Sequence, residues 1–297
     1  MTGSRVAASE TPPPDDSETN AGLTAVLDYL KRRRGFDFTA YKRSSLLRRV
    51  RVRMQMVAVP DLATYLDRLR VDPDEFIRLF HTLLINVTSF FRDPTGWDRL
   101  RDEIVPRLIG PADSTRPIRA WSAGCASGEE AYSLAMLLAE ALGPEAFRAR
   151  VRIYATDVDE EAVAQARHAV YGTRAAEEIP APLLEKYFVR LDDTYHLDQE
   201  LRRAVIFGRH DLLQDAPIAR VDLLTCRNCL MYFNPETQAR ILARFHFALV
   251  PSGVLFLGKA ETLSQAATFE ALDLQRRLFV RTERQPEMRH PTIAHDR

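Results

Sequence analysis

The chain of 297 residues contains only three cysteines, Cys125, Cys226 and Cys229. Three cysteines do not make the disulfide framework that staples small secreted proteins. The sequence also lacks an N-terminal apolar segment followed by a cleavage site, and no apolar run is long enough to span a bilayer. These absences predict a cytoplasmic, reduced protein that does not insert into a membrane.

Metal-binding patterns are also missing. Cys226 and Cys229 form a Cys-x-x-Cys pair, but zinc needs about four ligands, and neither a second cysteine pair nor a suitably spaced histidine stands nearby. The seven histidines are scattered, and none forms a nucleophile–base pattern with serine or cysteine. We therefore predict no metal site. For the cysteine pair, a redox role stays open beside simple packing.

The chain has no net charge, because 41 Lys and Arg balance 41 Asp and Glu. The total therefore gives no hint of nucleic-acid or membrane binding. The balance hides one basic segment, since ten basic residues and one acid between Lys31 and Arg53 give it a net charge of +9. This segment indicates an acidic partner, although a charge run can also be a solvated helix face.

The first part of the chain has a helical pattern. Residues 1–20 are rich in proline, serine, threonine and acids, and we expect a disordered leader there and a flexible tail over 285–297. Between 21 and 85, apolar residues at helical spacing predict a small all-α domain. Its helices are expected at 23–34, at 44–56, at 62–70 with Asp61 as N-cap, and from Pro73 to about residue 85.

Strands then alternate with helices over residues 86–284. We expect strands at 118–123, 151–156, 221–226 and 254–258, with helices at 128–142, 159–170 and 235–250 and a turn at 251–253. This alternation is typical of a parallel sheet covered by helices on both faces. Short alternating segments at about 187–206 predict a small β-subdomain. The expected fold class is therefore α/β and Rossmann-like, preceded by the helical domain.

The turn after the first predicted strand is the most informative stretch. Gly124 and Gly128 carry no Cβ, so a ligand can approach their backbone closely. The turn is not a P-loop, and Glu129 and Glu130 would repel the phosphates that helix N-termini attract. A ligand with a sulfonium and an ammonium, such as S-adenosylmethionine, would favour these carboxylates. The alternative is that both glutamates only complement the helix dipole.

Polar residues also follow the next predicted strands. Asp157 ends the second strand, where an acid can accept hydrogen bonds from both ribose hydroxyls of an adenosine. Asp211 could accept a hydrogen bond from an adenine amino group while Leu212 packs on the ring. Arg227 and Asn228 follow the strand at 221–226. Because the strand ends of such a sheet meet at one edge, we expect these residues to line one crevice.

Several motifs resemble the CheR family of chemotaxis receptor methyltransferases. They are Asn86-Val87-Thr88-Ser89-Phe90-Phe91-Arg92, Trp121-Ser122-Ala123 leading to Ser127-Gly128-Glu129-Glu130-x-Tyr132-Ser133, and Cys226-Arg227-Asn228 with Tyr232-Phe233. The resemblance runs from about residue 23 to 280. It implies a class I methyltransferase fold. It also implies an enzyme that transfers a methyl group from S-adenosylmethionine to glutamate side chains of chemoreceptor cytoplasmic helices, leaving S-adenosylhomocysteine.

The resemblance also implies which residues form the site. Arg92 and Tyr232 would lie nearest the transferred methyl group, as the predicted catalytic pair. Members often have asparagine in place of Asp211, a difference that concerns the adenine contact. The β-subdomain here is also several residues shorter than in members that dock a receptor tail peptide, so we expect no tail docking. Together with Gly124 of the glycine turn, the predicted cofactor contacts are Asn86, Thr88, Arg92, Glu129, Asp157, Asp211, Leu212, Arg227 and Asn228.

The predicted partner is the acidic, glutamate-bearing helical bundle of a chemoreceptor, bound by a monomer. Other functions stay open. A nucleic-acid methyltransferase would use the basic helix for RNA, but no aromatic residues interleave with its arginines, so we expect no nucleic-acid partner. A non-catalytic scaffold would bind the cofactor without transfer, and the acids on the glycine turn disfavour a nicotinamide oxidoreductase. The predicted partner-binding residues are Arg43, Arg48, Arg49, Arg51 and Arg53.

Overall fold

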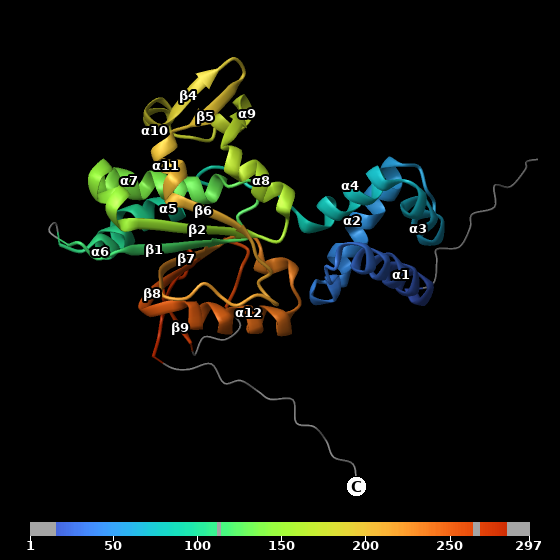
Figure 1. The fold of residues 1–297 in the computed structure, drawn as a ribbon. Coiled ribbons are helices and arrows are strands. Elements are labelled where there is room, and N and C mark those ends of the chain that lie inside the picture. Colours follow the sequence, from blue (N-terminus) through green and yellow to red (C-terminus); the bar gives the residue numbers. More distant parts are fainter. Residues whose placement is uncertain (1–15, 112–113, 264–267, 284–297) are drawn as a thin grey trace, which may run out of the picture. The chain divides into compact units, whose positions relative to one another are not determined.

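The structure is a computed structural model that describes residues 16–111, 114–263 and 268–283. The chain divides into two compact units, Met1–Leu84 and Ile85–Arg297. The predicted tail and residues 1–15 of the predicted leader lie outside the described residues. Residues 16–20 of that leader form the first turns of helix α1 (Figure 1).

The first unit is all-helical, which confirms the sequence prediction. Asp61 caps the third helix by accepting a hydrogen bond from the Thr64 backbone N–H at 2.8 Å, the role expected from its position. The unit's core includes three aromatic rings that pack edge to face. The ring centres of Phe36, Phe38 and Phe80 lie within 6.2 Å of one another. Its elements are α1 (Asp16–Arg34), η1 (Phe38–Ala40), α2 (Arg43–Met56), α3 (Leu62–Val71) and α4 (Pro73–Leu84).

The second unit is built on a seven-stranded sheet with the order β6-β2-β1-β7-β8-β10-β9. The strands from β6 to β8 run parallel, and β10 runs antiparallel to both of its neighbours. This arrangement confirms the expected α/β class. The strands are β1 (Ile118–Ala123), β2 (Val151–Asp157), β6 (Val205–Arg209), β7 (Val221–Cys226), β8 (Leu249–Leu257), β9 (Phe269–Asp273) and β10 (Leu278–Arg281).

Helices cover both faces of this sheet (Figure 1), with α7 and α8 on one face and α12 on the other. No helix among the described residues is long and apolar enough to cross a membrane. The helical elements around the sheet are α5 (Pro94–Arg99), the π-helical turn η2 (Leu100–Ile104), α6 (Val105–Ile109), α7 (Glu129–Arg150), α8 (Glu160–His168), α11 (Gln199–Ala204), η3 (Leu230–Tyr232) and α12 (Pro235–Ala248).

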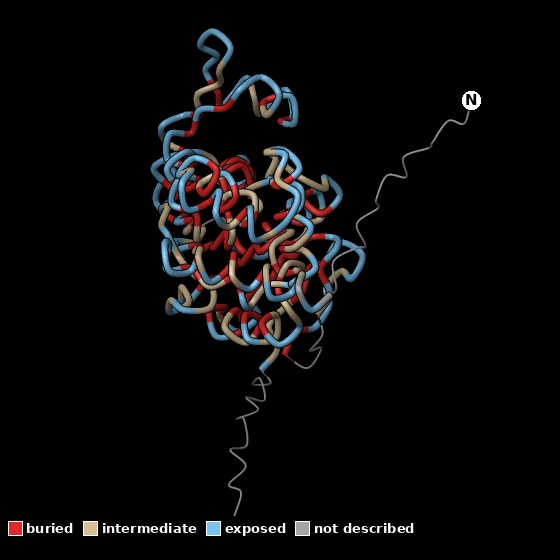
Figure 2. Tube along the Cα trace, turned by 90° about the vertical axis from the view of Figure 1, so that its right-hand side faces the viewer, coloured by how far each residue is buried: buried red, intermediate tan, exposed pale blue. Residues whose placement is uncertain are grey.

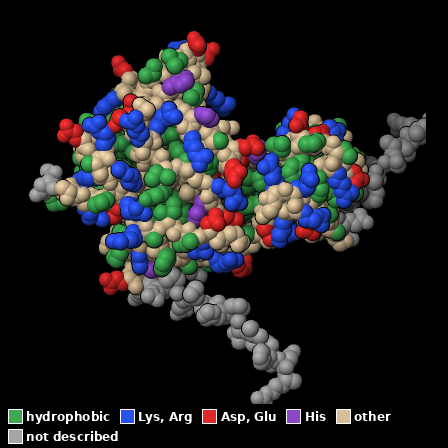
Figure 3. Space-filling model, viewed as in Figure 1, with side chains coloured by type: hydrophobic (Ala, Val, Ile, Leu, Met, Phe, Trp, Pro, Cys, Tyr) green, Lys and Arg blue, Asp and Glu red, His purple; other side chains and the backbone are tan. Residues whose placement is uncertain are grey.

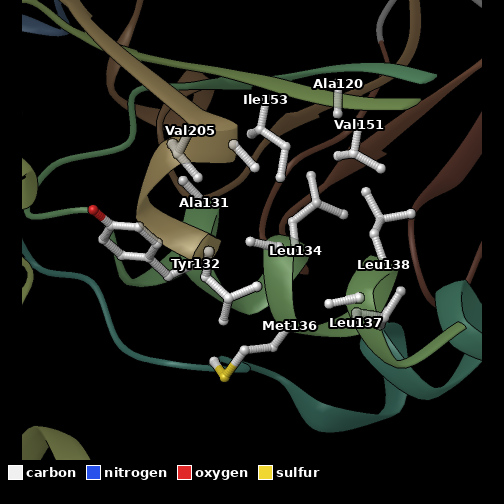
Figure 4. Packing of buried hydrophobic residues seen from close by; sticks show 14 of the residues in the cluster. Ala120, Ala131, Tyr132, Leu134, Met136, Leu137, Leu138, Val151, Ile153 and Val205 are labelled. Atoms are coloured by element: carbon white, nitrogen blue, oxygen red, sulfur yellow. The ribbon is translucent and has the colours of Figure 1, made fainter. Parts of the chain in front are cut away.

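The core of the second unit lies between α7 and the sheet. Leu134 and Leu138 of α7 point toward Ala120, Val151 and Ile153 of the strands (Figure 4), and all five side chains are fully buried. Burial of a leucine side chain contributes roughly 1.5–3 kcal/mol. This packing therefore fixes where α7 begins, and with it the turn that precedes the helix.

Two breaks expected from the sequence lie inside longer elements of the structure. The turn expected at 251–253 is an irregularity within β8, where the register with β7 shifts and Ser252 adopts a φ of 61°. The helix expected to end at 142 does break there, because Gly143 is non-helical with a φ of 72° and a ψ of 165°, and a further helical segment counted within α7 runs on to Arg150. In both cases the glycine-containing signal marks a real break in the backbone.

The small β-subdomain is a three-stranded sheet with the order β3-β5-β4. It begins at Val170 rather than near residue 187, because Ala169 turns left-handed with a φ of 52° and ends α8. Much of its tip is exposed (Figure 2). The last predicted residues of the subdomain belong to β6 of the large sheet. Its elements are β3 (Val170–Gly172), α9 (Thr173–Ala176), α10 (Ala181–Tyr187), β4 (Phe188–Leu191) and β5 (Thr194–Leu197).

Candidate cofactor site

The candidate site lies where the strand order reverses. β1 is flanked by β2 and β7, and the residues at their carboxyl ends pair in register, Ala123 with Thr156 and Ser122 with Thr225. Open α/β sheets bind ligands in the crevice outside these strand ends. Most of the predicted cofactor residues follow directly after one of the parallel strands, so the fold brings them to this one edge.

The glycine turn between β1 and α7 needs both glycines. Gly124 and Gly128 have φ values of 76° and 94°, which side chains disfavour. A Cβ on Gly124 would lie 3.1 Å from the Cys229 sulfur, and one on Gly128 would lie 2.9 Å from the Ala166 Cβ. The turn is therefore packed closely against Cys229, just before η3, and against α8. Sequence reasoning found the glycines through ligand approach and missed this packing reason.

Asp157 ties the end of β2 to the glycine turn. Its carboxylate accepts hydrogen bonds from the backbone N–H of Ala126 at 2.9 Å and of Asp159 at 3.0 Å. Burial raises its pKa above the usual value, against the opposing effect of these two bonds. A carboxylate has about four acceptor positions, so Asp157 keeps the capacity to accept from two hydroxyl groups as well.

The adjacent glutamates at the start of α7 differ in their surroundings. Glu130 accepts hydrogen bonds from Ser122 of β1 at 2.7 Å and from Thr225 of β7 at 2.6 Å, so it joins two strands. Glu129 instead lies against Ser127 of the glycine turn, whose hydroxyl oxygen is 2.8 and 3.0 Å from its two carboxylate oxygens. Burial raises the pKa of Glu129. Only Glu129 therefore faces the turn.

Arg227 joins the end of β7 to the turn that contains Arg92. Its guanidinium donates hydrogen bonds to the Arg92 carbonyl oxygen at 2.6 Å and to the Asp93 carboxylate at 3.1 Å. The side chain is 3% exposed and lies 4.6 Å from the ring centre of Phe256. Burial lowers the pKa of Arg227, and its buried Nε has no hydrogen-bond partner among the described residues.

The segment from Asn86 to Arg92 runs beside the starts of α7 and α8. The Asn86 amide donates a hydrogen bond to the Asp159 carboxylate at 2.5 Å, and the Phe91 backbone N–H donates to the Ser133 hydroxyl at 3.0 Å. The Arg92 guanidinium donates to the Val87 carbonyl oxygen at 3.0 Å. Thr88, between these anchored ends, is half-buried.

A buried glutamate that sequence reasoning missed holds the loop after β7. Glu261 is 2% exposed, and each of its carboxylate oxygens accepts two backbone hydrogen bonds. One oxygen accepts from Cys229 at 2.8 Å and Leu230 at 2.6 Å. The other accepts from Asn228 at 3.0 Å and Gly258 at 2.6 Å. The only sequence signal was an acid shortly after a predicted strand.

Asn228 has the most constrained backbone of this loop. It adopts a left-handed φ of 59°, and a Cβ on Gly258 would lie 2.7 Å from its backbone nitrogen. Its side-chain oxygen is buried and has no hydrogen-bond partner in the described part of the chain. A buried acceptor without a partner is costly unless a ligand or water donates to it. Tyr232 follows in η3, whose start the same Glu261 carboxylate holds.

The end of β6 also reaches this edge. The His210 backbone N–H donates a hydrogen bond to the Asp157 carbonyl oxygen at 2.9 Å. Asp211 accepts a hydrogen bond from the Leu213 backbone N–H at 2.8 Å, which closes the following turn. Leu212 lies in that turn and is half-buried. The predicted adenine-contacting pair therefore stands next to the acid of β2.

These residues fit S-adenosylmethionine. The buried carboxylate of Glu129 and the half-buried carboxylate of Asp157 suit an ammonium and ribose hydroxyls, and the unpartnered oxygen of Asn228 offers one further acceptor. In the described ranges, no group of three or more His, Cys, Asp or Glu side chains could hold a metal ion. At the cysteine pair, a hydrogen bond between the Cys226 thiol and Cys229, together with burial, raises the pKa of Cys226.

Comparisons with known proteins identify the family of the chain. Residues 86–278 match the family described as CheR methyltransferase, SAM binding domain, and residues 21–84 match CheR methyltransferase, all-alpha domain. The chain belongs to the CheR methyltransferase family, which confirms the resemblance seen in its motifs. Its cofactor is S-adenosylmethionine, and its class of activity is that of an S-adenosylmethionine-dependent methyltransferase.

Three relatives illustrate the match. An uncharacterized 104.1 kDa protein of Rhodobacter capsulatus is 38% identical over 266 residues, which cover 89% of this chain but only 28% of that protein. A chemotaxis protein methyltransferase of Listeria innocua is 34% identical, covering 85% of this chain and 94% of its own length. Chemotaxis protein methyltransferase 2 of Pseudomonas aeruginosa is 33% identical, covering 84% and 89%.

Proposed function

We propose that the chain methylates glutamate side chains on the cytoplasmic helices of a chemoreceptor, forming glutamyl methyl esters and S-adenosylhomocysteine. Family membership and relatives named chemotaxis protein methyltransferase support this proposal. The observation that carries it is the contact of Arg227 with Arg92, because this contact joins the segment of one proposed catalytic residue to the loop that leads to the other, Tyr232.

The proposed acceptor needs no general base. A glutamate with a reference pKa near 4.3 is ionised at neutral pH and is already a nucleophile. When bound, the cofactor supplies an electrophilic methyl group on its sulfonium. The protein must therefore desolvate and align one carboxylate oxygen. Alignment can contribute roughly 7–11 kcal/mol, compared with about 10²–10⁴-fold in rate from general-base catalysis.

In this proposal, Arg92 and Tyr232 align the acceptor by donating hydrogen bonds to its carboxylate. Arg92 is held in place at its carbonyl oxygen by the Arg227 guanidinium and by the Trp97 indole, the latter at 3.0 Å. One N–H of its own guanidinium bonds to Val87, and a guanidinium has five such donors. The remaining donors suit a planar, two-pronged contact with a carboxylate.

We propose that the receptor docks on the exposed side of α2 in the first unit. Two of the predicted partner-binding arginines make contacts within the unit. The Arg53 guanidinium pairs with the fully buried Glu75, with a distance of 3.1 Å from the Arg53 Nε to a carboxylate oxygen. Arg49 donates a hydrogen bond to the Thr82 carbonyl oxygen at 2.9 Å. Arg48 and Arg51 are exposed. The docking face therefore rests on these two, and Arg43, Val52 and Met56 are further exposed residues of the same helix.

The deciding experiment transfers labelled methyl from S-adenosylmethionine to receptor cytoplasmic fragments and then treats the product with mild alkali. Label released as volatile methanol identifies a carboxyl methyl ester, as the proposal requires. Base-stable label would identify another acceptor atom and contradict the proposal. Cofactor binding without any transfer to a panel of receptor fragments would favour a non-catalytic scaffold.

A further inference from the structure

The second unit contains a hollow that the proposed methyl transfer does not use. It has a volume of about 380 Å³ and lies beside β6, the edge strand of the large sheet, next to α8 and α11. Small-molecule sites begin at roughly 300 Å³. The hollow is therefore large enough for a small ligand, and its chemistry can be read from its lining.

The lining is strongly basic. It contains Arg167, Arg202 and Arg203 and no acidic residue, with Gln199 beside them. Figure 3 shows Lys and Arg side chains gathered over this part of the second unit, around α7, α11 and β6. Arg203 pairs with Glu200 just outside the lining, at 2.9 Å. In the described part of the chain, no carboxylate pairs with Arg167 or Arg202, so two guanidinium charges are uncompensated.

Both of these guanidinium groups are held in place by the backbone. Arg167 donates a hydrogen bond to the Phe207 carbonyl oxygen of β6 at 2.9 Å, and Arg202 donates to the Arg167 carbonyl oxygen at 3.2 Å. Each guanidinium has five N–H donors, so most remain available for a ligand. Because the groups are already fixed, binding a ligand would cost less side-chain entropy than binding to free arginines.

Part of the lining of the hollow is aromatic. Tyr132 is 1% exposed, and its ring centre lies 5.4 Å from that of the half-buried Phe207. Burial raises the pKa of Tyr132, and the nearby charge of Arg202 opposes that shift, so this guanidinium acts on the lining itself. The site therefore combines an aromatic lining with two exposed guanidinium groups that the backbone holds and that no carboxylate of the described residues pairs with.

We propose that this hollow binds the phosphoryl group of a small phosphorylated molecule. A phosphoryl group carries close to two negative charges and three acceptor oxygens, so it can engage both guanidinium groups in two-pronged contacts. A carboxylate would satisfy only one of them in this way. The concave shape and small volume favour a small molecule over an acidic protein surface.

The test is calorimetric titration of inorganic pyrophosphate into the full chain. We expect saturable binding at one site, weakened at least about tenfold in the Arg167→Gln/Arg202→Gln double variant, the effect of losing charge-assisted hydrogen bonds. The control, Arg107→Gln/Arg174→Gln, removes the same charge at exposed positions outside the hollow and should bind as the wild type does.

Several results would overturn the proposal. These are non-saturable heats, equal weakening in the test and control variants, or a poly-glutamate peptide that needs Arg167 and Arg202 while pyrophosphate does not bind. If the double variant unfolds, Arg202→Lys replaces it, because lysine keeps the charge but loses the planar fork. Wild-type affinity in that variant would also contradict a two-pronged phosphoryl contact.

Discussion

Replacing Glu261 with glutamine tests whether this buried carboxylate positions the loop that carries Asn228 and leads to Tyr232. The change is small in size but not in chemistry. Each oxygen of Glu261 accepts two backbone hydrogen bonds, so a glutamine in either orientation turns an amide NH₂ toward two N–H donors. Two backbone donors then lose their acceptor, whichever way the side chain is placed.

The expected loss of stability follows from those two orphaned donors. A buried donor left without a partner costs about 1–3 kcal/mol, so two cost about 2–6 kcal/mol. Part of this is offset because glutamine buries no charge, and burial already raises the pKa of Glu261. A net loss of about 2–4 kcal/mol is a large fraction of the 5–15 kcal/mol that typically stabilises a folded protein.

Urea unfolding followed by tryptophan fluorescence measures this loss in the right part of the chain. Both tryptophans, Trp97 and Trp121, lie in the second unit, so their signal reports its unfolding. Calorimetry with S-adenosylhomocysteine then measures the affinity of the cofactor site. If the loop moves because it has lost one or two hydrogen bonds, we expect at least about tenfold weaker binding. Glu270→Gln, at an exposed position on β9, is the matched control.

The reasoning would be refuted by a glutamine variant that unfolds at the same urea concentration as the wild type and binds the product with unchanged affinity. Loss of stability with unchanged affinity would also contradict the positioning role, since it would leave Glu261 as a purely structural residue. Weakened affinity in the Glu270→Gln control would mean that the assay responds to any lost carboxylate.

Four further predictions concern other parts of the chain. Tyr232→Phe should lower turnover while leaving the cofactor Kd nearly unchanged; a large loss of cofactor binding would contradict the aligning role. Receptor binding by the wild type should weaken as salt is raised, and changing Arg48 and Arg51 to glutamate should abolish it; a co-sedimentation assay at two ionic strengths measures both effects. Gly128→Ala should destabilise the second unit by at least about 1–3 kcal/mol in urea, because the new Cβ would lie 2.9 Å from a methyl carbon of α8 at a φ of 94°. Because burial raises the pKa of Glu129 above 4.5, protonation begins at a higher pH than for an exposed glutamate, so calorimetric affinity for S-adenosylmethionine should fall as pH drops through that raised pKa. Glu129→Gln should bind weakly without this pH dependence.

Much of the fold could be predicted because its signals are local. The strand at 118–123 was expected with the same bounds that it has in β1, and the Asp61 cap of α3 follows from a residue type at one position. Alternating strands and helices then imply a parallel sheet, whose strand ends meet at one edge by geometry alone. That most of the candidate site residues lie at one edge therefore followed from the sequence, since it depends on connectivity and on which residues follow each strand.

Only the tertiary structure decided which of several chemically similar residues have partners within the fold. Glu129 and Glu130 are adjacent and identical, yet Glu130 is bound by Ser122 and by Thr225, which lies 95 positions away in the chain. In the sequence, Arg53 cannot be distinguished from the neighbouring arginines; in the structure, it pairs with the buried Glu75.

The same holds for Glu261, whose donors are Gly258, just after β8, and three backbone N–H groups of a loop more than thirty residues earlier. No local pattern encodes such contacts, because each depends on which distant groups are buried together. A buried polar group must find its partners wherever the fold places them. The sequence by itself thus determined most helices and parallel strands, their order, and the sheet edge at which the candidate cofactor residues gather. The packing of distant segments decided which acids and arginines hold the fold together and which remain available for binding.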